Sequence, residues 1–262
     1  MQLELENKTV LVTAATYGLG YACAEAFAKE NVRLAICSRD QARVNGTIEK
    51  LSKLGQSEVF GFRADLTNDH DIARLIEQTN ESLGKLDILL LNTGHPPTYS
   101  LLKTNDEHWQ RGVDLILKPA IKLTQAFLPQ MQKNRYGRLI YIGSIFGLQP
   151  EPSSIIQSTL RTGLNAFVKC VASEAASDGV TANVICPGYF HTPLAEALAA
   201  KYASEAGKTA DEVINSWREL APSKKFGRSE DLGALVTFLA SARAEFINGT
   251  TVTIDGGLVK QY

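Results

Sequence analysis

The stretch TVLVTAATYGLG, residues 9–20, decides the fold expected for this chain. Thr9–Thr13 form a compact run typical of a buried strand, and from Leu19 to Lys29 apolar residues recur at helical spacing. Gly18 and Gly20 lie at the turn between them, where glycine permits a close approach of the backbone. Such a turn presents free N–H groups and the positive end of a helix dipole, an arrangement that binds phosphate. The two glycines also fit a tight strand–helix turn without a ligand.

The alternation of strand and helix continues along the chain. One run, residues 87–91, is almost entirely apolar, as expected of a strand buried on both faces. This alternation predicts an α/β fold with a doubly wound parallel sheet, and no linker-like stretch divides it, so we expect one domain over residues 1–262. Strands are expected at 9–13, 32–37, 59–62, 87–91, 139–142, 181–185 and 251–254, and helices at 19–29, 41–54, 71–83, 107–133, 154–177 and 231–241.

Residues 191–227 depart from this alternation. The segment is rich in alanine and charged residues and lies between the sixth strand and the last helix. Val213, Ile214, Trp217 and Leu220 form a helical apolar stripe within it. An insertion beyond the carboxyl end of a strand is a candidate lid over a site, so we expect a substrate lid here.

The composition argues against several classes of protein. The 27 basic and 28 acidic residues give a net charge of −1, without the basic excess that nucleic-acid binding favours. No apolar run reaches the roughly 18 residues that span a bilayer, so we expect no membrane partner. The four cysteines are scattered and lack metal-ligand spacing, which predicts reduced thiols, no metal site and a cytoplasmic protein.

Six segments, in order and at matching spacings, resemble the short-chain dehydrogenase/reductase family. Residues 13–20 are similar to its TGxxxGxG pattern, with Ala14 in place of the first glycine. Residues 226–257 are similar to the ending of 3-oxoacyl-(acyl carrier protein) reductases. The resemblance implies a Rossmann-type dinucleotide-binding fold. Its other matching residues are Asp65-Leu66, Asn92 and Gly94, Ser144, and Pro187-Gly188 with Thr192, whereas Leu91 and Thr93 depart from the family's NNAG signature.

The resemblance also implies a cofactor site. We expect NADP, with NAD as the alternative, because Ser38 and Arg39 end the second strand, where an acidic residue would bind the ribose hydroxyls of NAD. A guanidinium can instead fork onto a 2′-phosphate, although Arg39 can also be a solvated surface residue. The residues expected to contact the cofactor are Thr13, Thr16, Gly18, Leu19, Gly20, Ser38, Arg39, Asp65, Leu66, Asn92, Gly94, Arg161, Pro187, Gly188 and Thr192.

The catalytic positions implied by the resemblance are mostly altered. Ser144 matches the family's serine, but Gln157 stands where the family has tyrosine and Arg161 where it has lysine. A tyrosine and a lysine four residues apart share one helix face, and the lysine charge lowers the phenol pKa for proton transfer. Gln157 does not titrate and Arg161 keeps its charge. Asp114 aligns with the family's asparagine, so we expect a catalytic set of Ser144, Gln157, Arg161 and Asp114.

Three functions stay open at this point. The first is an NADP-dependent oxidoreductase that reduces a carbonyl, or oxidises an alcohol, of a small-molecule substrate by hydride transfer. Its proton would come from water, His95, Tyr189 or His191. The second is a non-catalytic NADP-binding or assembly protein. The third is a non-redox enzyme, such as a lyase or dehydratase, that reuses the pocket.

A homo-oligomer, either tetramer or dimer, is expected from the same resemblance. Leu164, Phe167, Val168 and Val171 lie on one of the two long helices that would meet in a four-helix seam between subunits. The alternative is that these side chains pack on the sheet of their own subunit.

Overall fold

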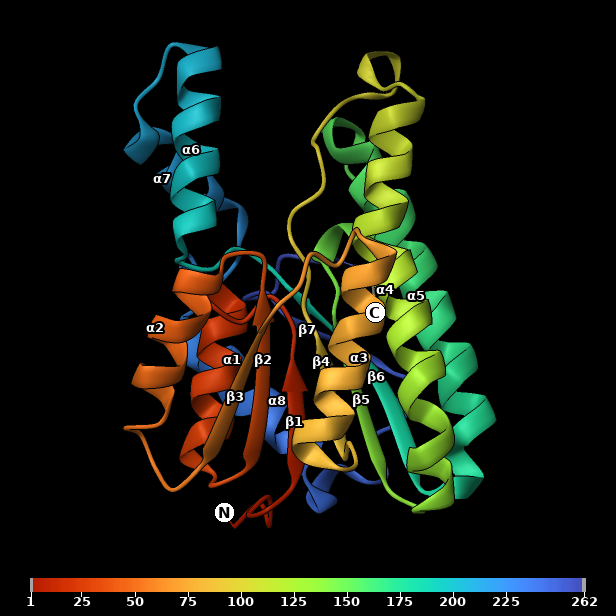
Figure 1. The fold of residues 1–262 in the computed structure, drawn as a ribbon. Coiled ribbons are helices and arrows are strands. Elements are labelled where there is room, and N and C mark those ends of the chain that lie inside the picture. The colour runs from red at the N-terminus through yellow and green to blue at the C-terminus, as the bar shows by residue number, and fades with distance from the viewer. Residues whose placement is uncertain (1, 261–262) are drawn as a thin grey trace.

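Seven strands form one parallel sheet in the computed structural model, which describes residues 2–260 (Figure 1). The strand order is β3-β2-β1-β4-β5-β6-β7, and every pairing is parallel. The sequence predicted all of these strands, with small differences at their ends. They are β1 (Thr9–Val12), β2 (Arg33–Ser38), β3 (Glu58–Arg63), β4 (Ile88–Leu91), β5 (Gly137–Ile142), β6 (Val180–Pro187) and β7 (Thr251–Ile254).

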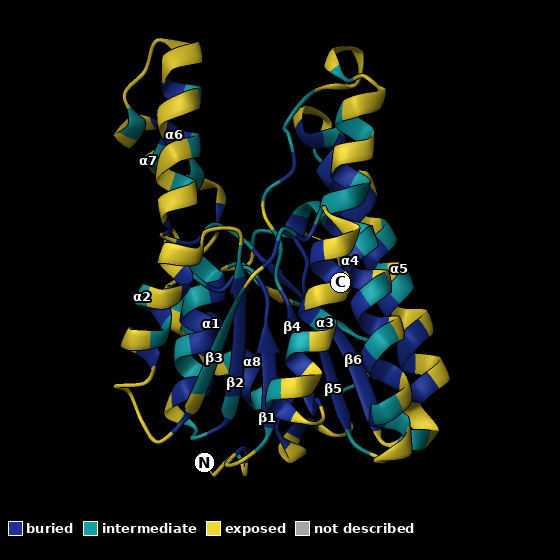
Figure 2. Cartoon of the chain, viewed as in Figure 1, coloured by how far each residue is buried: buried dark blue, intermediate teal, exposed yellow. Residues whose placement is uncertain are grey.

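Helices cover both faces of the sheet. The helices α1 and α8 pack on one face, and α3, α4 and α5 pack on the other. This arrangement explains why β1, β4, β5 and β6 are buried along their whole length (Figure 2). Within residues 2–260 the α-helices are α1 (Gly18–Lys29), α2 (Gln41–Leu51), α3 (Asp69–Leu83), α4 (Asp106–Lys133), α5 (Ile155–Ala175), α6 (Pro193–Ala206), α7 (Ala210–Leu220) and α8 (Ser229–Ala240).

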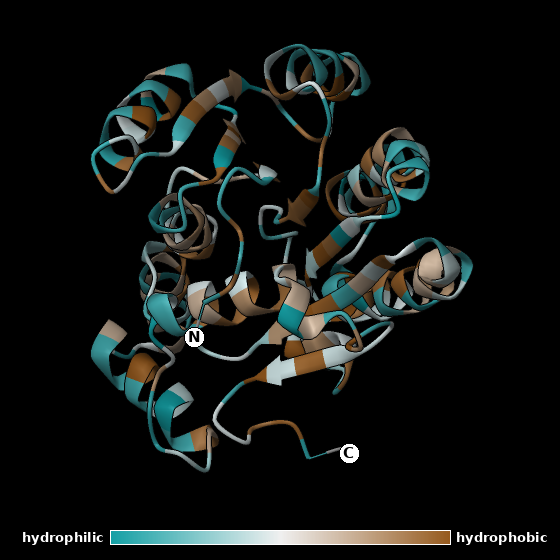
Figure 3. Ribbon diagram, turned by 90° about the horizontal axis from the view of Figure 1, so that it is seen from below, coloured by the Kyte–Doolittle hydropathy of each residue, from teal (hydrophilic) through white to brown (hydrophobic). Residues whose placement is uncertain are grey.

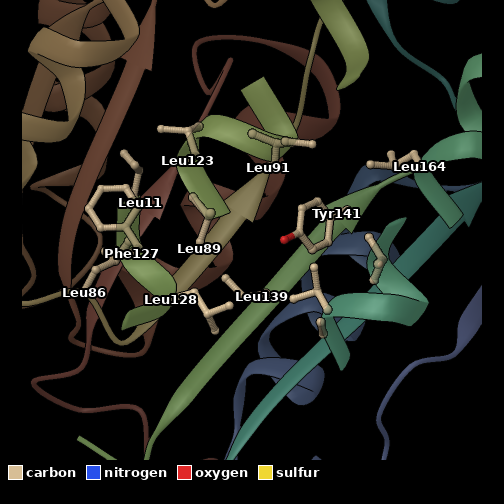
Figure 4. Packing of buried hydrophobic residues seen from close by; sticks show 14 of the residues in the cluster. Leu11, Leu86, Leu89, Leu91, Leu123, Phe127, Leu128, Leu139, Tyr141 and Leu164 are labelled. Atoms are coloured by element: carbon tan, nitrogen blue, oxygen red, sulfur yellow. The ribbon is translucent and has the colours of Figure 1, made fainter. Parts of the chain in front are cut away.

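The larger core lies between the sheet and the two long helices α4 and α5 (Figure 4). Strand residues such as Leu89 and Tyr141 meet Leu123 and Phe127 of α4 there. The Tyr141 hydroxyl is fully buried but lies 2.6 Å from the Thr124 Oγ1, so its hydrogen-bonding need is met inside the core. Hydrophobic residues dominate several strands when the molecule is seen from below (Figure 3). Because the strands are packed between helices on both faces, their carboxyl ends have fixed positions relative to one another.

The segment 191–227 folds as the helix pair α6 and α7, which rises above the sheet (Figure 1). Thr192 caps α6 by accepting a hydrogen bond from the Ala195 N–H at 3.2 Å. Gly207 ends that helix with a φ of 63°, in the left-handed region that favours glycine. A capping box between Thr209 and Glu212 then starts α7. Local sequence signals thus define both helices of the insertion.

The base of the insertion is closed by a short parallel bridge between Phe190 and Gly227. The His191 N–H donates to the Gly227 carbonyl at 3.2 Å, and the Gly227 N–H donates to the Tyr189 carbonyl at 2.9 Å. A Cβ at Gly227 would lie 2.7 Å from the Phe190 ring, so only glycine fits this contact. The two ends of the insertion are therefore fixed next to the carboxyl end of β6.

Two further expectations concern the whole chain. None of the helices within residues 2–260 is both long and apolar enough to cross a membrane. Cys23, Cys37 and Cys186 are buried free thiols, whereas Cys170 is a free thiol exposed on α5. Three of the four cysteine thiols are therefore shielded from solvent.

Candidate active site

A cavity of about 510 Å³ opens at the carboxyl edge of the sheet. Its wall comes from the segments after β1, β4, β5 and β6, and from residues of α5, α6 and α7. The strand order reverses between β1 and β4, and such sheets bind ligands in the crevice outside that reversal. Ten of the expected site residues line this cavity: Gly18, Leu19, Asn92, Gly94, Ser144, Gln157, Arg161, Pro187, Gly188 and Thr192.

The turn between β1 and α1 places the N-terminus of α1 at the cavity, where Gly18 and Leu19 line the wall. Tyr17 precedes α1 without capping it through its side chain, and the first turn of the helix carries no acidic residue. A Cβ at Gly20 would lie 2.2 Å from the Ala14 carbonyl oxygen, so the turn closes tightly only with glycine there. These observations fit a bound phosphate group, since a helix N-terminus without a side-chain cap or an acidic first turn favours an anion.

Ala14 lines the cavity in a strained conformation. Its φ is 48°, in the left-handed region that L-residues with a Cβ seldom adopt. Gly18 has a φ of 58° in the same turn, at no such cost. The position that resembles the first glycine of the family pattern therefore keeps a glycine-like backbone while carrying a methyl group.

Thr13 holds the ends of β1 and β4 together beneath the cavity. Its Oγ1 donates to the Asn92 carbonyl at 2.6 Å and accepts from the Asn92 N–H at 2.9 Å. The Asn92 side-chain amide donates to the Ala14 carbonyl at 3.3 Å. Thr13 is fully buried, and its role in this structure is to position the turn.

Ser38 and Arg39 continue the carboxyl edge of the sheet beyond the cavity. The Thr16 hydroxyl donates to the Ser38 Oγ at 3.0 Å, which ties the end of β2 to the β1–α1 turn. Arg39 is exposed, and within residues 2–260 its guanidinium takes part in no side-chain hydrogen bond or ion pair. The Asp65 carboxylate accepts two hydrogen bonds from Thr67, and Leu66 is buried. The expected cofactor residues that do not line the cavity in this region are Thr16, Gly20, Ser38, Arg39, Asp65 and Leu66.

Ser144 and Gln157 form a buried hydrogen-bonded pair in the cavity wall. The Ser144 Oγ accepts from the Gln157 Nε2 at 2.9 Å and from the Phe146 N–H at 3.2 Å. Both lone pairs of the hydroxyl are then engaged, so its hydrogen is left to donate. The Gln157 Oε1 has no partner although the residue is only 7% exposed. The pair therefore contains one hydroxyl hydrogen left to donate and one buried acceptor without a partner among residues 2–260.

Arg161 places a buried positive charge beside this pair. One guanidinium nitrogen donates to the Ile142 carbonyl and the other to the Thr93 Oγ1 at 3.2 Å, while Nε has no partner. Burial lowers the pKa of Arg161 to about 10, which still leaves it cationic near neutral pH. A buried cation whose partners are all uncharged is costly, so the site favours a ligand that carries or develops negative charge.

Asp114 lies on α4 outside the cavity lining. Its carboxylate contacts the Lys118 ammonium at 2.6 Å and accepts from the Gln110 side chain at 3.1 Å. The structure therefore does not bring Asp114 together with Ser144, Gln157 and Arg161.

The three alternative proton donors have different surroundings. His95 lines the cavity, and burial together with the charges of Arg161 and Lys201 lowers its pKa. Tyr189 also lines the cavity, but burial and the nearby Glu151 raise its pKa, so the phenol stays neutral. His191 is exposed and is not part of the lining.

Some residues of the site carried no usable signal in the sequence. Thr93 holds Arg161 and Tyr202 of α6 lines the cavity, yet neither belongs to a pattern of spacing that indicates such a role. Trp217 and Leu220 were identified as part of an apolar stripe, and the structure places both in the cavity wall. Only the fold shows that this stripe faces the same space as Ser144.

Comparison with known proteins identifies the family. Residues 13–259 match the family model described as Enoyl-(Acyl carrier protein) reductase. The chain is 31% identical to an uncharacterized oxidoreductase of Bacillus subtilis over 99% of both chains. It is 29% identical to the 3-oxoacyl-(acyl-carrier-protein) reductase MabA of Mycobacterium avium, over 96% of this chain and 90% of that one. Its structure is similar to that of L-sorbose reductase from Gluconobacter frateurii complexed with NADPH and L-sorbose. That similarity has a TM-score of 0.95 at 28% identity and covers 100% of both chains. The chain therefore belongs to the short-chain dehydrogenase/reductase family and is similar to its 3-oxoacyl reductases.

Proposed function

We propose that this protein is an NADPH-dependent oxidoreductase that reduces a carbonyl group of a small molecule. The observation that carries the proposal is the meeting, in one cavity, of an open helix N-terminus, a free hydroxyl donor on Ser144 and the buried cation of Arg161. The similarity to a reductase whose structure contains NADPH supports the same reading. Reduction of a carbonyl develops negative charge on the carbonyl oxygen, and a hydroxyl donor and a cation stabilise that charge.

The residues of the β1–α1 turn and the edge of the sheet fit the cofactor. The N–H groups at Gly18 and Leu19 would bind the pyrophosphate, and the exposed guanidinium of Arg39 would bind the 2′-phosphate. Asn92, Gly94, Pro187, Gly188 and Thr192 would enclose the rest of the molecule. NADPH supplies the hydride when it is bound.

Ser144 and Arg161 act on the substrate oxygen in this proposal. The Ser144 hydroxyl donates a hydrogen bond to the carbonyl oxygen, and the Arg161 charge stabilises the negative charge that develops on it. The Gln157 Oε1 accepts a hydrogen bond from the hydroxyl of the product alcohol. The product alcohol can therefore bond to both Ser144 and Gln157, whereas the substrate ketone can bond only to Ser144. Gln157 cannot supply the proton, which comes from water or from His95.

The remaining expected residues take supporting roles. Asp114 anchors Lys118 on α4, and we assign it a structural rather than a catalytic role. Thr13, Thr16 and Ser38 hold the strand ends that position the cofactor turn. The insertion of α6 and α7 is the lid over the substrate.

We further propose that the protein is a cytoplasmic homo-oligomer. Its free thiols suit a reducing compartment. Leu164, Val168 and Val171 are buried in the core against the sheet, so a seam along α4 and α5 would use the outward residues of these helices, such as the 38% exposed Ile121. Light scattering coupled to size exclusion would measure the mass, and a monomer would contradict the proposal.

A second candidate is a protein that binds NADPH without reducing a substrate. The observation that favours it is Gln157, because this side chain has no proton to transfer where the family pattern has a tyrosine.

Two measurements separate these candidates. Titration with NADPH and then NADH, followed by quenching of Trp109 and Trp217 fluorescence, tests binding. Absorbance at the NADPH band, with a panel of ketones and aldehydes, tests turnover. Tight binding with a preference for NADPH and steady oxidation with at least one carbonyl compound is the expected result. Binding without oxidation across the panel favours the second candidate, and no binding of either cofactor rejects both.

A further inference from the structure

The cavity that Ser144 and Gln157 line also has an aromatic group in its wall, called its aromatic end. Tyr189 follows β6, Tyr202 lies on α6 and Trp217 lies on α7, and all three line the cavity. The rings of Tyr189 and Trp217 are stacked, with centroids 5.3 Å apart and planes 5° from parallel. Tyr202 meets the Trp217 ring edge-on at 6.0 Å and 84°. The three side chains fix one another and form a rigid, flat-walled subsite.

Leucine side chains extend this subsite toward solvent. Leu194 and Leu198 of α6 and Leu220 of α7 line the same cavity. Leu194 is 38% exposed and Leu220 is 61% exposed, although both face a cavity of about 510 Å³. Apolar surface that lines a pocket and is left uncovered by the chain is typical of a binding site for an apolar ligand.

The only charged side chain of the cavity lining shown to be close to this aromatic end, within residues 2–260, is Glu151, which together with burial raises the pKa of Tyr189. Glu151, Arg161 and His95 are the charged or titratable residues of the lining apart from the tyrosines. Arg161 is committed to Ile142 and Thr93 at the end of β5. Among the described lining residues, the aromatic end therefore offers a substrate no cation to bind a carboxylate or phosphate.

We infer that the substrate is a neutral aryl or arylalkyl ketone, with its carbonyl at Ser144 and its ring against Tyr189, Tyr202 and Trp217. This inference rests on the proposed function, and it names the substrate class of the same cavity. It distinguishes this chain from the Gluconobacter frateurii reductase, whose structure contains the sugar L-sorbose.

Calorimetric titration with 4-phenyl-2-butanone, with and without NADP+, tests the inference. The oxidised cofactor has no hydride to give, so binding is measured without turnover. We expect saturable binding of the ketone and no measurable heat from L-sorbose. Trp217→Ala and Tyr189→Ala should each weaken ketone binding by about tenfold or more, since each removes aromatic contact area. Trp217→Phe keeps an aromatic ring and should retain most of the affinity.

The matched control is Phe246→Ala, which removes an aromatic side chain that is 99% exposed and does not line the cavity. It should leave ketone binding unchanged. Ketone affinity that survives both Trp217→Ala and Tyr189→Ala, in variants whose melting temperature equals that of the wild type, would overturn the inference. Binding of L-sorbose in preference to the ketone would also overturn it.

Measuring NADPH oxidation with each substrate tells a failure of this inference from a failure of the proposed function. If the aryl ketone binds through Trp217 but NADPH is never oxidised, the subsite is supported and hydride transfer is rejected. If NADPH is oxidised with sugars and not with aryl ketones, hydride transfer is supported and the aromatic subsite is rejected.

Discussion

The Gln157 side chain donates a hydrogen bond to the Ser144 Oγ over 2.9 Å, so these two residues act as one unit in the cavity wall. The bond occupies a lone pair of the serine, and the Phe146 N–H occupies the other. The serine hydrogen is then directed to a ligand rather than to the protein. An amide in this place orients the serine but adds no titrating group to the site.

Ser144→Ala should lower kcat/KM for the best carbonyl substrate by about 10²- to 10³-fold, the usual effect of losing one donor to a developing oxyanion. The affinity for NADPH should change little, because the serine contacts the substrate oxygen. Ser153→Ala is the matched control, since Ser153 also lines the cavity but its hydroxyl donates to Glu151. Equal losses in the two variants would contradict a specific role for Ser144.

The double variant Gln157→Tyr with Arg161→Lys should raise kcat by about 10²- to 10⁴-fold toward simple 3-oxoacyl thioesters or ketones, because it supplies a titrating phenol and a nearby lysine. Gln157→Tyr alone should gain less, because it supplies the phenol without the lysine that accompanies it in the family pattern. Steady-state NADPH oxidation measures both. A folded double variant that binds NADPH and shows no gain would mean that the substrate carbonyl does not sit at position 157.

Ala14→Gly should leave the free energy of unfolding unchanged or raise it by up to about 1 kcal/mol. Relief of the left-handed strain at Ala14 is worth about 1–2 kcal/mol, and the added flexibility of glycine offsets about half of that. The same change should tighten NADPH binding, since the methyl group lines the cavity. Urea denaturation and fluorescence titration measure the two effects.

Ala15→Gly serves as the control for that prediction. Ala15 is fully buried and is not among the residues with positive φ, so glycine there should lower the free energy of unfolding by about 0.5–1 kcal/mol. Destabilisation of the same size in both variants would show that the φ of Ala14 carries no strain.

Arg39→Ala should weaken NADPH binding by about tenfold or more and leave NADH binding nearly unchanged, because the lost contact is a charge-assisted hydrogen bond to the 2′-phosphate. Lys53→Ala removes another exposed cation, beyond the end of α2, and should change neither affinity. Equal weakening of NADPH and NADH by Arg39→Ala would argue against a phosphate contact.

Stability should fall more steeply with acid in the wild type than in His95→Gln. Burial and the charges of Arg161 and Lys201 lower the pKa of His95 in the folded state. As the pH falls below about 6.5, the unfolded chain takes up this proton before the folded chain does, so the free energy of unfolding decreases. Urea titrations between about pH 7 and pH 5 would show the difference.

His70→Gln is the control for the acid prediction, because His70 is exposed on α3. It should follow the wild-type curve. If His95→Gln follows that curve as well, the surroundings of His95 do not lower its pKa in the folded state.

Much of the fold could be predicted because its signals are local. The continuous apolar run ending in Leu91 indicates a strand buried on both faces, and the structure buries β4 completely. The helical stripe around Trp217 likewise predicted α7 within the insertion. These features depend on residues close in sequence, which is why the pattern alone was sufficient.

The site was predicted less fully, because it depends on contacts between distant segments. The pairing of Arg161 with Thr93 joins residues 68 positions apart, and no spacing rule indicates it. Asp114 was expected at the catalytic centre, but it does not line the cavity, and its carboxylate contacts Lys118 one turn along α4. The aromatic group of Tyr189, Tyr202 and Trp217 likewise forms only when α6 and α7 fold over the end of β6.

Hydride transfer itself is the most direct test of the proposed function. The protein would be incubated with NADPH deuterated at nicotinamide C4, both faces labelled, and with the carbonyl compound that gives the fastest oxidation. We expect mass spectrometry to find one deuterium on the carbinol carbon of the product alcohol. Tight NADPH binding with no deuterium in any product would rule out hydride transfer and leave a protein that holds the cofactor without using it.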